Sequence, residues 1–157
     1  MYHARISAVL CIVAGLATVA PAPLMADEVT TYVKDGAALG GIDPVAYFTD
    51  MKPVMGSDEF TATHDGVTWK FVSAEHRDMF TANPAKYAPA YGGYCATSAS
   101  FGYKIPIDPK TWDIHDGKLY LNAGDTPHKR YLFEVEGIIS RADTNWRKIK
   151  NVPADQL

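Results

Sequence analysis

Apolar and polar residues alternate in two stretches of the chain, and an Asp-Gly pair interrupts each stretch. Residues 59–73 read EFTATHDGVTWKFVS, in which every second residue after Asp65-Gly66 is apolar. Residues 112–122 read WDIHDGKLYLN and repeat this arrangement around Asp116-Gly117. Such alternation is typical of half-buried strands, and Asp-Gly favours the tight turn of a hairpin. The pattern therefore predicts two antiparallel β-hairpins.

Helical spacing is found in two other segments. Ser73 is a favourable N-cap for a helix over residues 74–83, which the Asn83-Pro84 pair ends. From about Pro127, apolar residues recur at steps of three and four, which predicts an amphipathic helix lying over the sheet that Gly137 could kink or divide. Its apolar positions are Leu132, Val135, Ile139, Ala142 and Trp146. The elements together predict a small single domain of the α+β class, with antiparallel β-hairpins packed against helices.

The first 26 residues follow a different pattern. Arg5 precedes an apolar run from Ile6 to Ala20, and Leu24-Met25-Ala26 forms a cleavage motif before Asp27. This order is typical of a secretory signal peptide, and the apolar run is shorter than the roughly 20 residues that a membrane-spanning helix needs. We therefore expect a mature domain over residues 27–157 that is periplasmic or secreted. A retained N-terminal anchor is the alternative.

Composition and cysteine count narrow the function classes. The chain has 15 Lys and Arg against 18 Asp and Glu, and no basic cluster, so we expect no nucleic-acid partner. After removal of the signal peptide, the sequence has no further apolar segment that would predict a membrane span. Cys11 lies within the predicted signal peptide, so the mature chain would keep only Cys95 and could form no internal disulfide. The lone thiol could pack in the core, pair with another chain or bind a ligand.

Several side chains could act with Cys95 as ligands of a soft metal. Thiolate, imidazole and thioether groups select metals such as Cu(I). His76 and Met79 are three residues apart on a predicted helix and share one face, and Cys95 follows that helix closely. The candidate metal ligands are Cys95, His76, His64 and Met79. The alternative is that Met79 lies in the core, His76 on the surface, and Cys95 is a small buried hydrophobic residue.

Three segments together resemble the exported bacterial branch of the YHS domain family: GIDPVAYF at 41–48, residues 64–96, and DPKTWDIHDGKLYLN at 108–122. The resemblance implies an association with metals, because related domains occur in copper-transporting ATPases and other metal-handling proteins. The better-known relatives carry three cysteines, at positions that correspond here to Ala46, Val72 and His76. A copy of their zinc-binding site is therefore excluded in this chain.

Around its cysteine, this chain has the string YGGYCA, residues 91–96. Glycine permits close backbone approach and left-handed dihedral angles, so Cys95 could face a pocket with aromatic walls. The candidate ligand-binding residues are Tyr91, Gly92, Gly93 and Tyr94. Alternatively, the glycine pair only turns the chain beneath the first hairpin.

The leading hypothesis is a periplasmic metal-binding protein, a copper carrier or buffer that binds through Cys95. It has no predicted catalytic residues, and its partners would be the metal ion and a metalloprotein or transporter that accepts it. The alternative hypothesis is a module that binds a non-metal ligand or a protein in an aromatic pocket around the cysteine. A thiol-dependent enzyme or a peroxide-responsive thiol is a third, because an accessible exported thiol can be oxidised.

Overall fold

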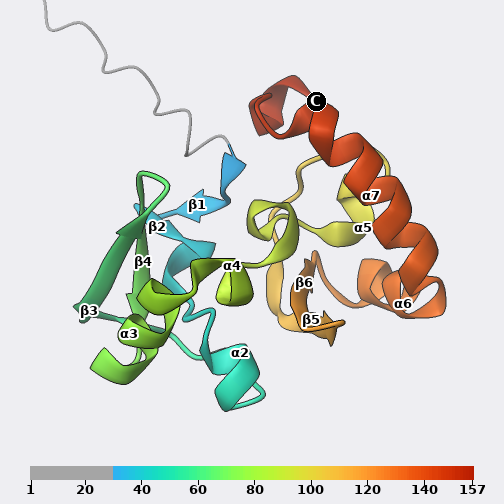
Figure 1. Cartoon of the computed structure of the whole chain (residues 1–157). Helices are drawn as coiled ribbons and strands as arrows, with labels where there is room; N and C mark the ends of the chain where they lie inside the picture. Colours follow the sequence, from blue (N-terminus) through green and yellow to red (C-terminus); the bar gives the residue numbers. More distant parts are fainter. Residues whose placement is uncertain (1–29) are drawn as a thin grey trace, which may run out of the picture.

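Antiparallel hairpins surrounded by short helices make up residues 30–157, the part of the chain that the computed structural model describes (Figure 1). The α+β prediction for a small single domain is confirmed. The predicted signal peptide, its cleavage site before Asp27 and Cys11 lie outside the described residues. Within residues 30–157, no helix is long and apolar enough to cross a membrane.

The first half of the domain contains the first predicted hairpin. Its elements are β1 (Val33–Lys34), β2 (Ala37–Ala38), η1 (Leu39–Gly41), α2 (Ala46–Thr49), β3 (Ser57–His64), β4 (Val67–Phe71), α3 (Ala74–Ala82) and α4 (Pro84–Tyr87). Strands β3 and β4 pair antiparallel up to His64 and Val67, so Asp65-Gly66 forms the predicted turn. Ser73 caps α3 as predicted, because its Oγ accepts a hydrogen bond from the His76 backbone N–H at 3.2 Å.

The second half contains the second hairpin and the longest helix. Its elements are η2 (Ala90–Gly93), α5 (Ala96–Ala99), β5 (Asp108–His115), β6 (Lys118–Asn122), α6 (Asp125–Phe133), α7 (Val135–Ile149) and η3 (Ala154–Gln156). Strands β5 and β6 pair up to His115 and Lys118, around the predicted Asp116-Gly117 turn.

The predicted C-terminal helix consists of two helices, and the break is at Glu134 rather than Gly137. Glu134 has a non-helical backbone, with φ −142° and ψ 53°. Leu132 precedes the break and is 53% exposed, so its prediction as an apolar contact of the same helix face was wrong. The remaining predicted positions lie on α7, where Ala142 is buried and Trp146 is partly buried.

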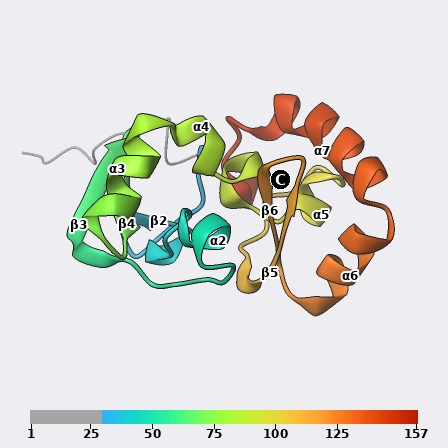
Figure 2. The same cartoon turned by 60° about the horizontal axis from the view of Figure 1, so that its bottom comes forward.

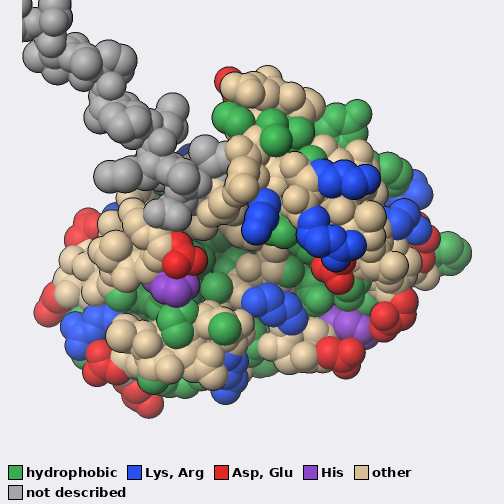
Figure 3. All heavy atoms as spheres, turned by 45° about the horizontal axis from the view of Figure 1, so that its top comes forward, with side chains coloured by type: hydrophobic (Ala, Val, Ile, Leu, Met, Phe, Trp, Pro, Cys, Tyr) green, Lys and Arg blue, Asp and Glu red, His purple; other side chains and the backbone are tan. Residues whose placement is uncertain are grey.

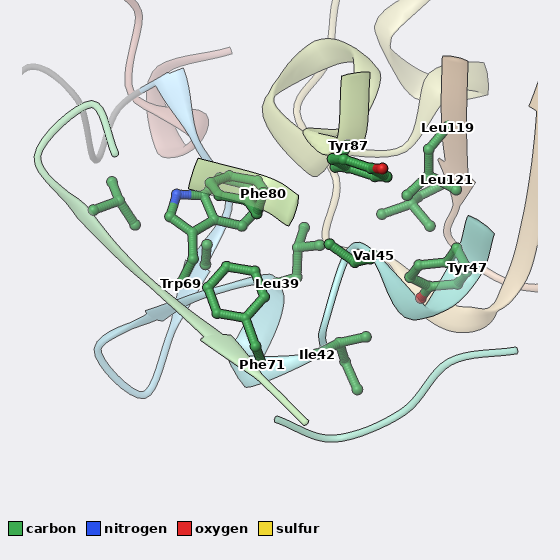
Figure 4. Packing of buried hydrophobic residues seen from close by; sticks show 12 residues of the cluster. Leu39, Ile42, Val45, Tyr47, Trp69, Phe71, Phe80, Tyr87, Leu119 and Leu121 are labelled. Carbon is green, nitrogen blue, oxygen red and sulfur yellow. The ribbon is translucent and has the colours of Figure 1, made fainter. Parts of the chain in front are cut away.

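Strand β6 separates two hydrophobic clusters. Leu119 and Leu121 belong to the first cluster, which also contains Trp69, Phe71 and Phe80 (Figure 4). Side chains alternate across a strand, so the intervening Tyr120 faces the second cluster, which α5, α6 and α7 cover. Figure 2 shows the β5–β6 hairpin between the two groups of helices. The domain therefore has two cores that share one strand.

The glycine pair of η2 lies against the first described residues of the chain. Three consecutive residues adopt left-handed backbone angles: Tyr91 (φ 54°), Gly92 (φ 60°) and Gly93 (φ 83°). The Gly92 carbonyl accepts a hydrogen bond from Tyr32 N–H at 2.8 Å. A Cβ atom on Gly92 would overlap the Thr30 carbonyl oxygen. Gly92 is thus required by the close approach of the N-terminal segment.

Substitution of Gly92 by alanine should destabilise the domain more than the same change at Gly102. Both glycines have positive φ, but a Cβ on Gly102 would meet no atom within 4 Å. The left-handed angle alone costs an alanine about 1–2 kcal/mol, which we expect for Gly102→Ala. Gly92→Ala adds the clash with Thr30, and urea denaturation should report a clearly larger loss. Equal losses would mean that the N-terminal segment moves aside at little cost.

Candidate functional site

Cys95 is completely buried, at 0% exposure. It is the N-cap of α5, and its Sγ accepts a hydrogen bond from Ser98 N–H at 3.4 Å. The same sulfur lies 3.8 Å from Oδ1 of Asn122, which is also fully buried. The thiol is therefore enclosed by its own helix and by the end of β6, and it lines none of the cavities described below.

His76 has a hydrogen-bond partner at each ring nitrogen. Its Nδ1 lies 2.7 Å from Asp43 Oδ2, and its Nε2 lies 3.2 Å from Thr49 Oγ1. The residue is only 9% exposed, so the alternative that placed it on the surface was wrong. His76 and Cys95 share no hydrogen-bond partner: His76 contacts Asp43 and Thr49, and Cys95 contacts Ser98 and Asn122.

The other two candidate metal ligands have surroundings of their own. Met79 is partly buried and packs against the first cluster. His64 lies at the end of β3, with Nε2 3.4 Å from Asp65 Oδ2 and its ring edge-on to Phe80. Among residues 30–157, no group of three or more His, Cys, Asp and Glu side chains is arranged to hold a metal ion.

The buried carboxylate of Asp43 binds four hydrogen-bond donors. Oδ1 accepts from the backbone N–H groups of Val45 (2.8 Å) and Ala46 (3.3 Å), and Oδ2 from Val72 N–H (2.9 Å) and His76 Nδ1 (2.7 Å). The start of α2, the end of β4 and helix α3 are thereby attached to one side chain. Our sequence reasoning missed this role, although an aspartate before proline is a common start of a turn.

The three positions that the sequence resemblance marked, 46, 72 and 76, meet at the same carboxylate. Ala46 and Val72 contribute backbone N–H groups, and His76 contributes its ring. In this chain, the junction between these three segments is held by hydrogen bonds around Asp43.

A cavity of about 200 Å³ lies where the two clusters meet. Trp69 of the first cluster and Trp146, which packs against the second, both line it. The other lining residues are Thr30, Thr31, His64, Asp65, Ala88, Pro89 and Gly92. In Figure 3, hydrophobic side chains form the floor of a hollow, with a histidine and an acidic side chain at its edge. This cavity combines indole side chains, an imidazole and an exposed carboxylate.

Aromatic residues and a buried lysine hold Trp146 in place. The rings of Tyr91 and Tyr94 lie 5.9 Å and 6.3 Å from the Trp146 ring, centroid to centroid. Lys104 Nζ lies 5.3 Å from the same ring and donates to the carbonyls of Lys150 and Val152 at the end of α7, at 2.7 Å each. Burial lowers the pKa of Lys104 to about 8.

Of the four predicted ligand-binding residues, only Gly92 lines this cavity. Tyr91 and Tyr94 instead contact the ring of Trp146, which also lines it. The Tyr91 hydroxyl donates to Asp143 Oδ1 at 3.0 Å, and burial is the main cause that raises the Tyr91 pKa. Gly93 instead faces the Leu39 side chain.

Other hollows of the described residues offer less to a ligand. A cavity of about 220 Å³ between Tyr32, Ile42 and Met55 has only Lys34 and Asp35 as charged groups. A groove of about 300 Å³ along α7 contains Arg141, but Arg141 Nη2 is already 3.0 Å from Glu134 Oε1.

Comparison of the chain with protein-family models, with curated proteins and with solved structures gave no match.

Replacement of Asp43 by asparagine should destabilise the domain by about 3 kcal/mol. The amide nitrogen cannot accept the hydrogen bonds that Oδ2 receives from Val72 and His76, so at least one buried donor loses its partner. Asp50→Asn, at the exposed end of α2, is the matched control and should change stability by less than about 0.5 kcal/mol. Chemical denaturation of both variants measures the difference. Similar stabilities of the two variants would contradict a central role for Asp43.

Proposed function

We propose that the mature chain is an exported ligand-binding module and that its ligand occupies the cavity between Trp69 and Trp146. The observation that carries the proposal is the position of this cavity, at the junction of the two clusters, with His64 and the exposed Asp65 in its lining. Small-molecule sites are commonly found at such junctions, with apolar walls and few polar groups. This is the aromatic-pocket hypothesis of the sequence, with the site at Gly92 and Trp146 rather than at the cysteine.

The size and lining of the cavity favour a ligand with one aromatic ring and a protonated amine. An engineered apolar cavity of about 150 Å³ holds one benzene molecule, so a cavity of about 200 Å³ can hold a ring with a short substituent. Indole side chains attract aromatic rings and cations. The Asp65 carboxylate is 69% exposed at the cavity edge, where an amine can reach it.

Tryptophan fluorescence should report binding of benzylamine in a Trp112→Phe variant. Trp112 packs on Tyr47, with ring centroids 5.3 Å apart, so its removal leaves the two cavity tryptophans as the only reporters. We expect a saturable change with benzylamine and a weaker one with benzyl alcohol, which has no charge. A linear, non-saturating response to benzylamine would contradict the proposal.

The charge at the cavity edge has a matched control in the second hairpin. Asp65 and Asp116 occupy the same turn position, with φ 49° and 48°, and asparagine tolerates such angles well. In the Trp112→Phe background, Asp65→Asn should weaken benzylamine binding by about fivefold, the effect of losing one exposed charge pair. Asp116→Asn should leave it unchanged. Equal affinities in the two variants would remove Asp65 from the site.

A copper carrier anchored by Cys95 is the second candidate function. The resemblance to a metal-handling family supports it, and of the three positions that this resemblance marks, 46, 72 and 76, only His76 has a metal-binding side chain. The two candidate copper ligands would first have to break their present hydrogen bonds. Cys95 Sγ accepts one from Ser98 N–H, and His76 is hydrogen-bonded to Asp43 and Thr49. A Cu(I) site there therefore needs a local rearrangement.

Titration of reduced protein with Cu(I) against a competing chelator separates the two candidates. Serine keeps the N-cap of α5, so Cys95→Ser should remain folded. If the ligand-binding proposal is right, wild type and Cys95→Ser should compete equally weakly for Cu(I). A stoichiometric site in wild type that is lost in Cys95→Ser and weakened in His76→Ala would establish the copper carrier instead.

A further inference from the structure

Three side chains form a hydrogen-bonded series from the interior to the surface, away from the ligand cavity. Asp43 Oδ2 lies 2.7 Å from His76 Nδ1, and His76 Nε2 lies 3.2 Å from Thr49 Oγ1. Asp43 is fully buried, the His76 side chain is 11% exposed, and Thr49 is exposed at the end of α2. An exposed hydroxyl is therefore backed by an imidazole, and the imidazole by a carboxylate.

The hydrogen bonds around Asp43 determine the tautomer of His76. All other contacts to this carboxylate come from N–H donors, namely those of Val45, Ala46 and Val72. An ionised carboxylate only accepts hydrogen bonds, so Nδ1 carries the proton that points at Oδ2. In neutral His76, Nε2 then has a free electron pair directed at Thr49 Oγ1. The imidazole is oriented to accept the hydroxyl proton.

We propose that Thr49 is a nucleophile that accepts an acyl group from activated esters of small carboxylic acids. Its Oγ1 attacks the ester carbonyl carbon while the hydroxyl proton passes to His76 Nε2. The bond from that carbon to the leaving oxygen then breaks, and the leaving alkoxide takes the proton from Nε2. The product is an ester on Thr49, and the imidazole returns to its neutral form. Asp43 acts as a positioning residue that holds the imidazole through Nδ1.

This arrangement follows the general rule for activated nucleophiles, in which a base within hydrogen-bond reach is oriented by a third group. The Thr49 hydroxyl has one proton and two acceptors, because the Val45 carbonyl also lies 3.2 Å from Oγ1. Rotation of the hydroxyl toward Nε2 therefore needs only the exchange of one hydrogen bond for another.

Two other threonines provide an internal comparison. Thr81 and Thr144 are exposed, and each donates to the carbonyl four residues earlier, at 2.8 Å and 3.1 Å, as Thr49 does at 3.2 Å. Neither has a histidine among its hydrogen-bond partners. Differences in acylation among the three sites thus isolate the contribution of His76.

The test treats the folded domain with p-nitrophenyl acetate and quantifies acetylated peptides by mass spectrometry. General base assistance is worth about 10²- to 10⁴-fold, so we expect Thr49 to be acetylated at least about 100-fold faster than Thr81 or Thr144. Thr49→Val should abolish acetylation at that position, Thr49→Ser should retain it, and Thr81→Val should change nothing at Thr49.

His76→Gln should lower the acetylation rate of Thr49 to that of Thr81, with thermal unfolding measured alongside to verify that the domain is folded. If that variant does not fold, the comparison of the three threonines in wild type and Thr49→Ser still decides. Equal acetylation of Thr49, Thr81 and Thr144 in the wild-type protein would overturn the proposal.

Discussion

The first half of the domain depends on one buried carboxylate. Asp43 accepts hydrogen bonds from residues up to 33 positions away in the sequence, in segments that have no strand pairing with one another. Burial of a charge is costly unless donors surround it, and four N–H groups surround this one. The position of α2, and with it the exposure of Thr49, follows from these bonds. So does the orientation of the His76 ring.

Features set by neighbouring residues could be predicted from the sequence. The two Asp-Gly turns and the Ser73 cap are such features, because every group involved lies within a few residues. A division of the C-terminal helix was expected at Gly137, but the break lies three residues earlier, at Glu134, where no glycine or proline marks it. The sequence also pointed to Gly92. A glycine is needed there because the Thr30 carbonyl leaves no room for a Cβ atom, and nothing in the local pattern indicates that contact.

The candidate site shows the same limit. A lone cysteine after two glycines suggested a presented thiol, whereas the structure encloses it against Asn122, 27 residues later. His76 was singled out for its type, but its partner Asp43 lies 33 residues earlier. Trp69 and Trp146 carry regular apolar spacing, which predicts burial and says nothing of a cavity between them. Pairings over such distances are set by the packing of the whole domain.

The shared strand β6 has a consequence for how the domain comes apart. Figure 2 suggests two lobes, but Leu119 and Leu121 contribute to one core and Tyr120 to the other. Detachment of this strand would expose apolar surface on both sides at once, so neither lobe has a stable state without its neighbour. The two lobes should therefore melt together as a single cooperative unit, and proteolytic cleavage between them would not release a folded half.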